Sequence, residues 1–263
     1  NAAALQSQYV IMYPTRRKID DSEYFPLSGR IMGGGSSVNM MGVSWPDRTD
    51  LDRWESLGNP GWSYEDCLPI LKRIESDQDF GDRPNHGSAG PLTVKRSMSL
   101  DEPQDQPMQG IIDRAASLGY PLSEDANGHA RFGLAPSAFN VKDGLRQSTS
   151  VAYLGLARGR SNLHIVGDAQ VVSLRFDGSR VTEVQYEQGN EIHAASADRF
   201  VLSAGTYHSP KILMLSGVGD PDELARLGIK PVHLLAGVGQ NYQDHAAVNM
   251  MYEGAADFVF DFL

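Results

Sequence analysis

One segment constrains the fold of this 263-residue chain more than any other. Residues 200–204 are almost all apolar, and Gly205 follows them directly. A continuous apolar run of this length is typical of a strand buried on both faces of a parallel sheet. Ser209 and Pro210 then predict the start of a helix that runs to residue 215, because proline is favoured in the first helical turn. A buried strand that leads through a glycine into a helix predicts an α/β fold.

The region before this segment is typical of a β-meander. Its turns are predicted at Asp177-Gly178 and Gly189-Asn190, and its strands over residues 163–166, 171–176, 181–187 and 191–195. Helical periodicity and end signals predict helices elsewhere, over residues 63–75, 111–118, 153–160 and 221–227. Two more strands are expected, over residues 91–94 and 229–235.

The charge balance excludes two classes of partner. With 23 Lys and Arg against 33 Asp and Glu, the formal net charge is −10. This argues against nucleic acid or an anionic membrane, because both require a basic surface. No run of about 18 apolar residues occurs, so no membrane span is expected.

The single cysteine, Cys67, cannot form an internal disulfide. No group of Cys and His residues has the spacing of zinc ligands, so no metal site is predicted. Cys67 lies at a position of the helical repeat, which favours a buried, inert thiol, with a reactive thiol as the alternative. This cysteine usage favours a reducing, cytoplasmic location.

Three glycine-rich stretches are candidate binding sites. Residues 29–39 contain three consecutive glycines followed by two serines and an asparagine, which allow close approach of a flat ligand; the alternative is a flexible surface turn. The helix after Gly205 could seat a diphosphate at its N-terminus, or simply turn a corner of the fold. Residues 237–245 gather hydrogen-bonding side chains that suggest a polar ligand, a buried network or an ordinary loop.

Two of these stretches resemble the paired signatures of the glucose–methanol–choline (GMC) oxidoreductases. The first signature is similar to Gly29-Arg30-x-x-Gly33-Gly34-Gly35-Ser36-x-Val38-Asn39. The second is similar to Gly205-Thr206-x-x-Ser209-Pro210-x-Ile212-Leu213-x-x-Ser216-Gly217-Val218-Gly219. The likeness covers roughly residues 25–250. It implies a flavoprotein that binds FAD and oxidises a small-molecule alcohol by passing hydride to the flavin.

The resemblance also implies which residues contact FAD. Residues 29–39 and their continuation to Gly42, together called the glycine loop, would lie along the flavin ring and its ribityl–diphosphate arm. Val171 would hold the adenine edge through its main chain. The full set of residues implied to bind the cofactor is Gly33, Gly34, Ser36, Ser37, Asn39, Met40, Met41, Gly42, Val171, Gly205, Ser209, Tyr242 and Asp244. On its own pattern, Val171 would be a plain strand residue.

The chain also departs from the family pattern. It contains no G-x-G-x-x-G turn, the element that places the diphosphate on a helix N-terminus. The family's catalytic histidine belongs to a segment that would follow Leu263, so no catalytic residue is predicted, and His245 is interpreted as a loop residue. Trp45 stands where relatives often carry arginine, and Val43 where they carry an aromatic residue. The chain therefore looks like the central portion of a flavoenzyme.

The expected architecture is mixed α/β, with an incomplete Rossmann-like FAD-binding domain, a β-meander and part of a substrate-binding domain. Residues 1–75 and 151–245 are assigned to the FAD-binding portion, and residues 76–150 and 246–263 to the substrate-domain portion. Exposed sheet edges in such a portion predict a homo-oligomer. Two other functions stay open: a non-catalytic folded fragment or binding module, and the lyase or photodecarboxylase chemistry of some relatives.

Overall fold

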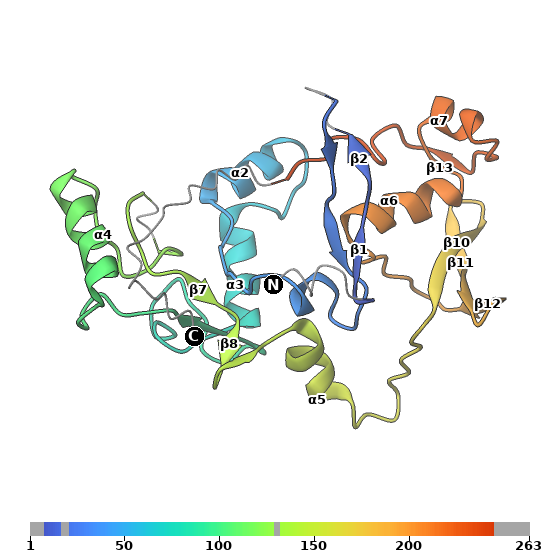
Figure 1. Ribbon diagram of the computed structural model, residues 1–263. Coiled ribbons are helices and arrows are strands. Elements are labelled where there is room, and N and C mark those ends of the chain that lie inside the picture. Colours follow the sequence, from blue (N-terminus) through green and yellow to red (C-terminus); the bar gives the residue numbers. More distant parts are fainter. Residues whose placement is uncertain (1–7, 17–20, 129–131, 245–263) are drawn as a thin grey trace. The chain divides into compact units, whose positions relative to one another are not determined.

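The structure is a computed structural model that describes residues 8–16, 21–128 and 132–244. The chain divides into two compact units, residues 1–164 and residues 165–263, whose helices and strands are labelled in Figure 1. This division differs from the expected grouping into FAD-binding and substrate portions, which stays a prediction. Residues 246–263 and His245 lie outside the described residues.

The N-terminal unit combines short strands with three longer helices. Strand β1 (Val10–Met12) pairs antiparallel with β4 (Leu27–Gly29), and β2 (Thr15–Arg16) with β3 (Glu23–Tyr24). A second sheet joins β5 (Glu75–Asp77) in parallel to β6 (Leu92–Arg96), which pairs antiparallel with β7 (Ala138–Phe139). The remaining elements are η1 (Gly34–Ser37), α2 (Arg48–Ser56), α3 (Tyr64–Ile74), α4 (Gln106–Ser117), the hairpin β8 (Val141–Lys142) and β9 (Leu145–Arg146), η2 (Ser150–Leu154) and α5 (Gly155–Ala157).

Side-chain caps explain where two of these helices begin. Asp47 accepts a hydrogen bond from the Thr49 amide at the start of α2, and Ser63 accepts one from the Asp66 amide at the start of α3. Each cap satisfies an amide that has no partner inside the helix. The predictions of a helix beginning at Ser63 and of a strand over residues 91–94 are therefore confirmed.

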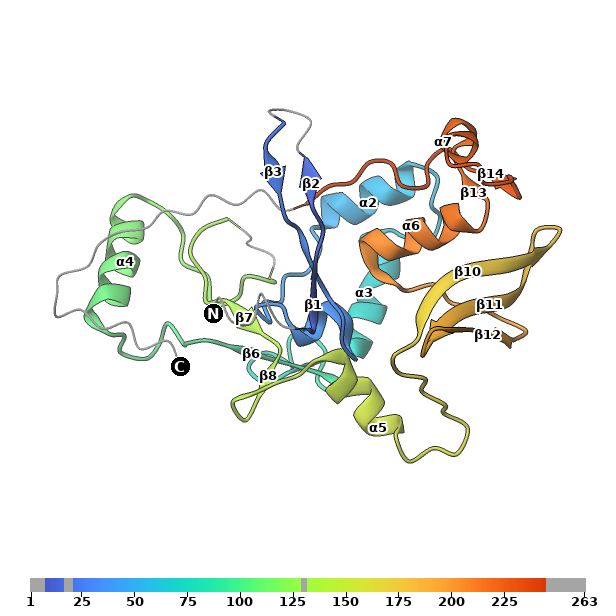
Figure 2. The same ribbon diagram turned by 45° about the vertical axis from the view of Figure 1, so that its right-hand side comes forward.

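The C-terminal unit contains the predicted meander. Strands β10 (Gln170–Asp177), β11 (Arg180–Gln188) and β12 (Glu191–Ser196) form an antiparallel sheet in that order. Both predicted turns are confirmed, with Gly178, Gly189 and Asn190 at positive φ. Helix α6 (Gly205–Leu215) lies alongside β10 (Figure 2). It is followed by β13 (Val218–Gly219), α7 (Pro221–Arg226) and β14 (His233–Leu234), and β13 and β14 pair in parallel.

The predicted buried strand over residues 200–204 is wrong. Within the described residues this segment has no strand partner, and Val201 is 89% exposed. A strand is stabilised by hydrogen bonds to a neighbour, so an apolar pattern alone cannot form one. Residues 163–166 are also not a strand, and the strand expected over residues 229–235 is reduced to β14.

Helix α6 begins at Gly205, four residues before the predicted start. Pro210 therefore lies inside the helix rather than in its first position. At this sixth position its nitrogen cannot donate to the Thr206 carbonyl and its ring crowds that carbonyl, which costs a helix about 3 kcal/mol. The mixed α/β class and the meander are nevertheless confirmed.

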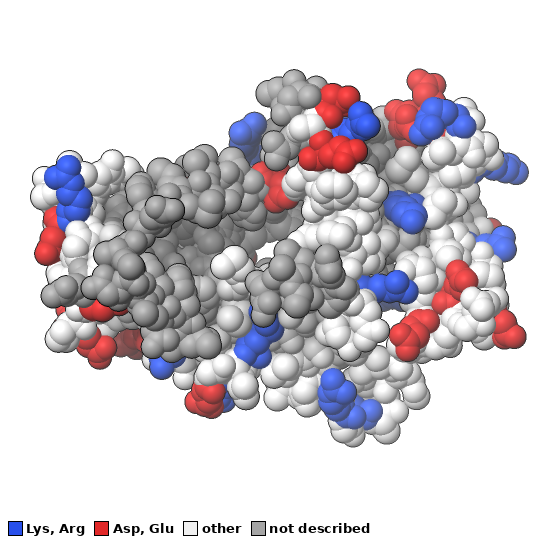
Figure 3. Space-filling view, viewed as in Figure 1, with Lys and Arg blue, Asp and Glu red and all other residues white. Residues whose placement is uncertain are grey.

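No helix of the described residues is long and apolar enough to cross a membrane. On the face of the molecule in Figure 3, Lys and Arg side chains are interspersed with Asp and Glu side chains. Several large apolar residues are exposed in both units, among them Met40, Phe132 and Leu156 in the first and Val201 in the second. The expected oligomer and the cytoplasmic location stay predictions.

Candidate functional site

The glycine loop of the N-terminal unit turns sharply at Gly33. Gly33 has a φ of +87° and Gly34 a φ of +54°. A Cβ atom at Gly33 would lie 2.5 Å from Ser37 Oγ and 3.1 Å from the Ser150 amide nitrogen. Position 33 therefore favours glycine for its backbone conformation, and a Cβ atom would also displace Ser37 Oγ and crowd the Ser150 amide. A Cβ atom at Gly34 or Gly35 would meet nothing within 4 Å, so this side of the loop is open.

Ser36 holds the loop in shape. Its hydroxyl donates to the Gly33 carbonyl (2.6 Å) and accepts from the Thr149 amide (3.0 Å). The hydroxyl of Ser37 donates to the Met32 carbonyl (2.7 Å). These bonds tie the loop to itself and to the segment around Thr149, more than a hundred residues later in the sequence. The loop is thus a fixed element of the N-terminal unit.

Residues Asn39 to Gly42 continue the loop as a mostly exposed segment. Arg146 Nη1 donates to Asn39 Oδ1 (2.8 Å) and to the Ser36 carbonyl (3.1 Å). Asn39 Oδ1 also accepts from the Met41 amide (3.0 Å), and Met40 is 87% exposed. Gly42 forms an isolated β-bridge with Phe139. The structure therefore brings together all eight predicted residues of this segment.

The other predicted residues lie in the C-terminal unit. Val171 pairs with Tyr186 in β10, an edge strand of the meander, beside a β-bulge at residue 172. Gly205 opens α6, and the Ser209 hydroxyl accepts from the Ala204 amide (3.0 Å). The Tyr242 hydroxyl donates to Asp244 Oδ2 (3.1 Å) and is 2.6 Å from the Tyr207 hydroxyl.

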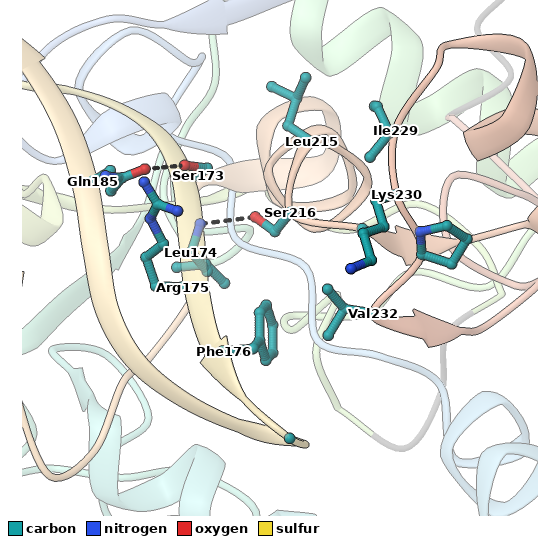
Figure 4. A pocket seen from close by; sticks show the side chains of 13 residues that line it. Ser173, Leu174, Arg175, Phe176, Gln185, Leu215, Ser216, Ile229, Lys230 and Val232 are labelled. Atoms are coloured by element: carbon teal, nitrogen blue, oxygen red, sulfur yellow. Dashed lines mark hydrogen bonds between the residues drawn. The ribbon is translucent and has the colours of Figure 1, made fainter.

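A shallow pocket of about 560 Å³ also lies in the C-terminal unit, between β10, the end of α6 and the segment before β14 (Figure 4). It is separate from the predicted residues. At its floor, the Ser216 hydroxyl accepts from the Leu174 amide (2.8 Å) and donates to the Ile212 carbonyl (2.6 Å). Ser216 therefore joins α6 to β10, the strand that carries Val171. The exposed side chains of Arg175 and Lys230 line the rim.

A buried charge cluster, not anticipated from the sequence, lies in the N-terminal unit. It consists of Glu75, Asp77, His86, Arg96 and Asp125, all at most 7% exposed. His86 Nδ1 lies 3.1 Å from Glu75 Oε2 and 3.0 Å from Asp77 Oδ2, and its Nε2 lies 2.8 Å from Asp125 Oδ2. Arg96 binds Asp77 through Nη1 and Asp125 through Nη2, the latter at 2.7 Å.

Burial and pairing act in opposite directions on the charges of this cluster. Burial disfavours a charged imidazole, but the hydrogen bonds to Asp125, Asp77 and Glu75 outweigh it and raise the pKa of His86 to about 11. Hydrogen bonds from His86 and Arg96 outweigh burial at Asp125 and lower its pKa to about 2. The same two donors also hold the pKa of Asp77 well below its usual range. His86 is therefore a cation at neutral pH. It shares the carboxylates with Arg96, and these two cations already occupy the space between the acidic groups.

These shifts predict how the stability of the N-terminal unit depends on pH. The raised pKa of His86 contributes stability that is complete below about pH 6.5 and is lost as the pH rises toward 11. The lowered pKa of Asp125 contributes stability that is lost as the pH falls from 3.8 toward 2. Urea unfolding across pH is expected to show a maximum between these ranges, with an alkaline slope of about 1.4 kcal/mol per pH unit from His86. In His86→Gln that slope should be absent; an unchanged slope would contradict the assignment.

The sequence carried only a weak signal of this cluster. Its members lie between residues 75 and 125, in a stretch that is mostly irregular, and they meet through contacts up to 39 residues apart. Two glycines of the same stretch have no space for a side chain: a Cβ atom would lie 1.9 Å from the Lys72 carbonyl oxygen at Gly87 and 2.2 Å from the Ile74 carbonyl carbon at Gly90. Such crowded glycines mark close packing, but only the fold shows what packs there.

Comparison with known proteins decides the family. The family model for GMC oxidoreductases matches residues 8–247. The chain belongs to the GMC oxidoreductase family. It is 34% identical to the oxygen-dependent choline dehydrogenase of Staphylococcus xylosus, over 94% of this chain and 46% of that protein. It is 36% identical to the mitochondrial choline dehydrogenase of Homo sapiens, over 86% of this chain and 37% of the human protein.

Solved structures of GMC oxidoreductases share the fold. Pyridoxine 4-oxidase from Mesorbium loti matches with a TM-score of 0.81 and 29% identity, over 88% of this chain and 45% of that one. An FAD-dependent oxidoreductase from Chaetomium thermophilum matches with a TM-score of 0.79 and 26% identity, over 90% and 43%. The expected family and fold are therefore confirmed. This GMC chain spans about half the length, or less, of these relatives.

Proposed function

We propose that this chain is the FAD-binding part of a GMC oxidoreductase that oxidises the CH–OH group of a small alcohol. The observation that carries the proposal is the glycine loop. Gly33 is fixed in a conformation that only glycine adopts readily, Ser36 holds the turn from inside, and Gly34 and Gly35 leave one side open. An open, rigid backbone surface of this kind fits a flat aromatic ring.

Each group of residues assigned to FAD is proposed to contact a different part of the cofactor. Residues 33–42 would line the flavin ring and its ribityl–diphosphate arm. In the C-terminal unit, β10 pairs with β11 on one side, so main-chain groups beside Val171 are available to hydrogen-bond the adenine edge. Gly205, Ser209, Tyr242 and Asp244 are proposed as further contacts of the C-terminal unit. When bound, FAD supplies the acceptor for the hydride that leaves the alcohol carbon.

The proposed substrate is a small alcohol. The relatives that carry 34–36% identity are named for choline, and the solved structure of highest identity among those described is named for pyridoxine. Alcohol oxidation needs a base within hydrogen-bond reach of the hydroxyl. His86 does not fit that role, because it is enclosed and holds its proton between three carboxylates.

FAD titration tests the proposal directly. We expect the 263-residue chain to quench the fluorescence of added FAD and to perturb its visible spectrum. Co-expression with the remaining segments of the Staphylococcus xylosus relative should yield a yellow complex whose flavin is bleached by a primary alcohol without oxygen. Absence of flavin binding, both by the chain alone and in the complemented complex, would refute the function. Binding without bleaching would favour a binding module.

A further inference from the structure

The C-terminal side of the glycine loop is tied to a neighbouring segment by a row of backbone hydrogen bonds. The Asn140 amide donates to the Met41 carbonyl (2.9 Å), and the Val43 amide donates to the Ala138 carbonyl (2.8 Å). The Asn127 side-chain amide donates to the Val43 carbonyl (3.2 Å). Residues 41–43 are thus paired with residues 138–140, and displacement of residue 43 would break the pairing next to residue 41.

This row ends at Trp45, which is 7% exposed and is held at two points. Its backbone amide donates to Asn127 Oδ1 (2.9 Å), and its indole Nε1 donates to Glu75 Oε1 (3.1 Å). Asn127 is itself fixed, because its backbone amide donates to Asp125 Oδ1 (3.0 Å). Trp45 is therefore hydrogen-bonded to one member of the buried charge cluster, Glu75, and to Asn127, which is bonded to a second member, Asp125.

The cluster fixes the direction of the Glu75 carboxylate. Glu75 Oε2 accepts from the Gly87 amide (2.9 Å) and lies 3.1 Å from His86 Nδ1, which leaves Oε1 for the indole. The Trp45 and His86 rings also lie 5.5 Å apart, between centroids. A carboxylate bound on one oxygen by a cation and an amide is a rigid acceptor for a donor at its other oxygen.

We propose that Trp45, with Asn127 and Glu75, forms an anchor through which the buried charge cluster positions residues 41–43, at the C-terminal end of the glycine loop. Trp45 acts as a positioning residue, and its effect on the cofactor rests on the proposed function. The anchor gives a structural role to the tryptophan that stands at position 45, where the family resemblance implies arginine. The indole offers one N–H donor, and Glu75 accepts its hydrogen bond.

Trp45→Phe tests the anchor by removing this donor while keeping an aromatic ring. Glu75 Oε1 loses its indole partner inside the protein, an arrangement that is costly for a buried acceptor. We expect amide hydrogen exchange at residues 41–43 to become about tenfold faster, and FAD binding to weaken about tenfold. Trp54→Phe is the matched control, because Trp54 lies on α2 and is 49% exposed; it should change neither quantity.

Unchanged exchange and affinity in Trp45→Phe would overturn the anchor, as would faster exchange with unchanged FAD affinity. If the wild-type chain alone does not bind FAD, affinity is measured in the complemented complex. Absence of binding there as well refutes the proposed function instead, and the exchange rates then decide the anchor alone. If Trp45→Phe does not fold, the wild-type chain supplies the test. The Trp45 indole N–H and the amides of residues 41–43 should exchange in one opening event, and faster, independent opening of residues 41–43 would overturn the proposal.

Discussion

Replacing His86 with glutamine is expected to destabilise the N-terminal unit by about 3–5 kcal/mol at neutral pH. In the wild-type chain, the charges of His86 and Arg96 are shared by Glu75, Asp77 and Asp125 inside the protein. The substitution leaves one guanidinium to balance three buried carboxylates. Removing one member of a buried ionic group is costly because the remaining charges keep their desolvation penalty without their partner.

Urea unfolding followed by circular dichroism measures this effect. His164→Gln is the matched control, because His164 belongs to the same unit and is exposed, and it should change stability by less than about 0.5 kcal/mol. Equal stabilities of the His86 and His164 variants would mean that the positive charge of His86 does not offset the cost of burying the three carboxylates.

Gly33→Ala is the second substitution with a large expected effect, and its target is the cofactor. The left-handed backbone at position 33 strains any residue with a Cβ atom, and here that atom would lie 2.5 Å from Ser37 Oγ. Moving Ser37 Oγ away breaks its bond to the Met32 carbonyl, and the Ser150 amide nitrogen, 3.1 Å from the new atom, must also give way. We expect a loss of about 1–3 kcal/mol in stability and a loss of FAD binding.

The control for this substitution lies two residues away. Gly35→Ala adds the same methyl group at a position without positive φ and with nothing within 4 Å of the new atom, so the fold should tolerate it. Thermal unfolding of both variants isolates the stability effect, and FAD titration of Gly33→Ala measures the effect on binding; Gly35 itself lies on the surface proposed to face the flavin. Wild-type FAD affinity in Gly33→Ala would show that the shape of the glycine loop does not control binding.

Elements with local signals could be predicted from the sequence. Ser63 caps α3 as expected, and the turn residues Gly178, Gly189 and Asn190 fix the meander because their left-handed conformations are encoded locally. Residues 200–204 fail for the opposite reason. Their apolar pattern is typical of a buried strand, but a strand forms only when a second strand pairs with it. No strand among the described residues pairs with residues 200–204.

The candidate site shows the same division. Residues 33–42 were recognisable because their spacing resembles a family signature, whereas their pattern alone left a flexible surface turn as the alternative. The charge cluster was not, because His86 and Asp125 are 39 residues apart and Glu75 reads as the polar end of a helix. Single polar residues in irregular segments carry no periodicity, so only the folded chain reveals that they meet.

The buried charge cluster has a consequence for how this part of the chain can vary. Three carboxylates meet two cations there, and each cation pairs with at least two of the carboxylates, so removing either cation alone leaves buried carboxylates without their partner. We therefore expect replacement of His86 or Arg96 to be tolerated only together with a change at a carboxylate partner, so that the segment from residue 75 to residue 127 behaves as one unit. Recombination with a relative should succeed when its crossovers flank that segment, whereas a junction inside it would assemble halves whose charges do not match.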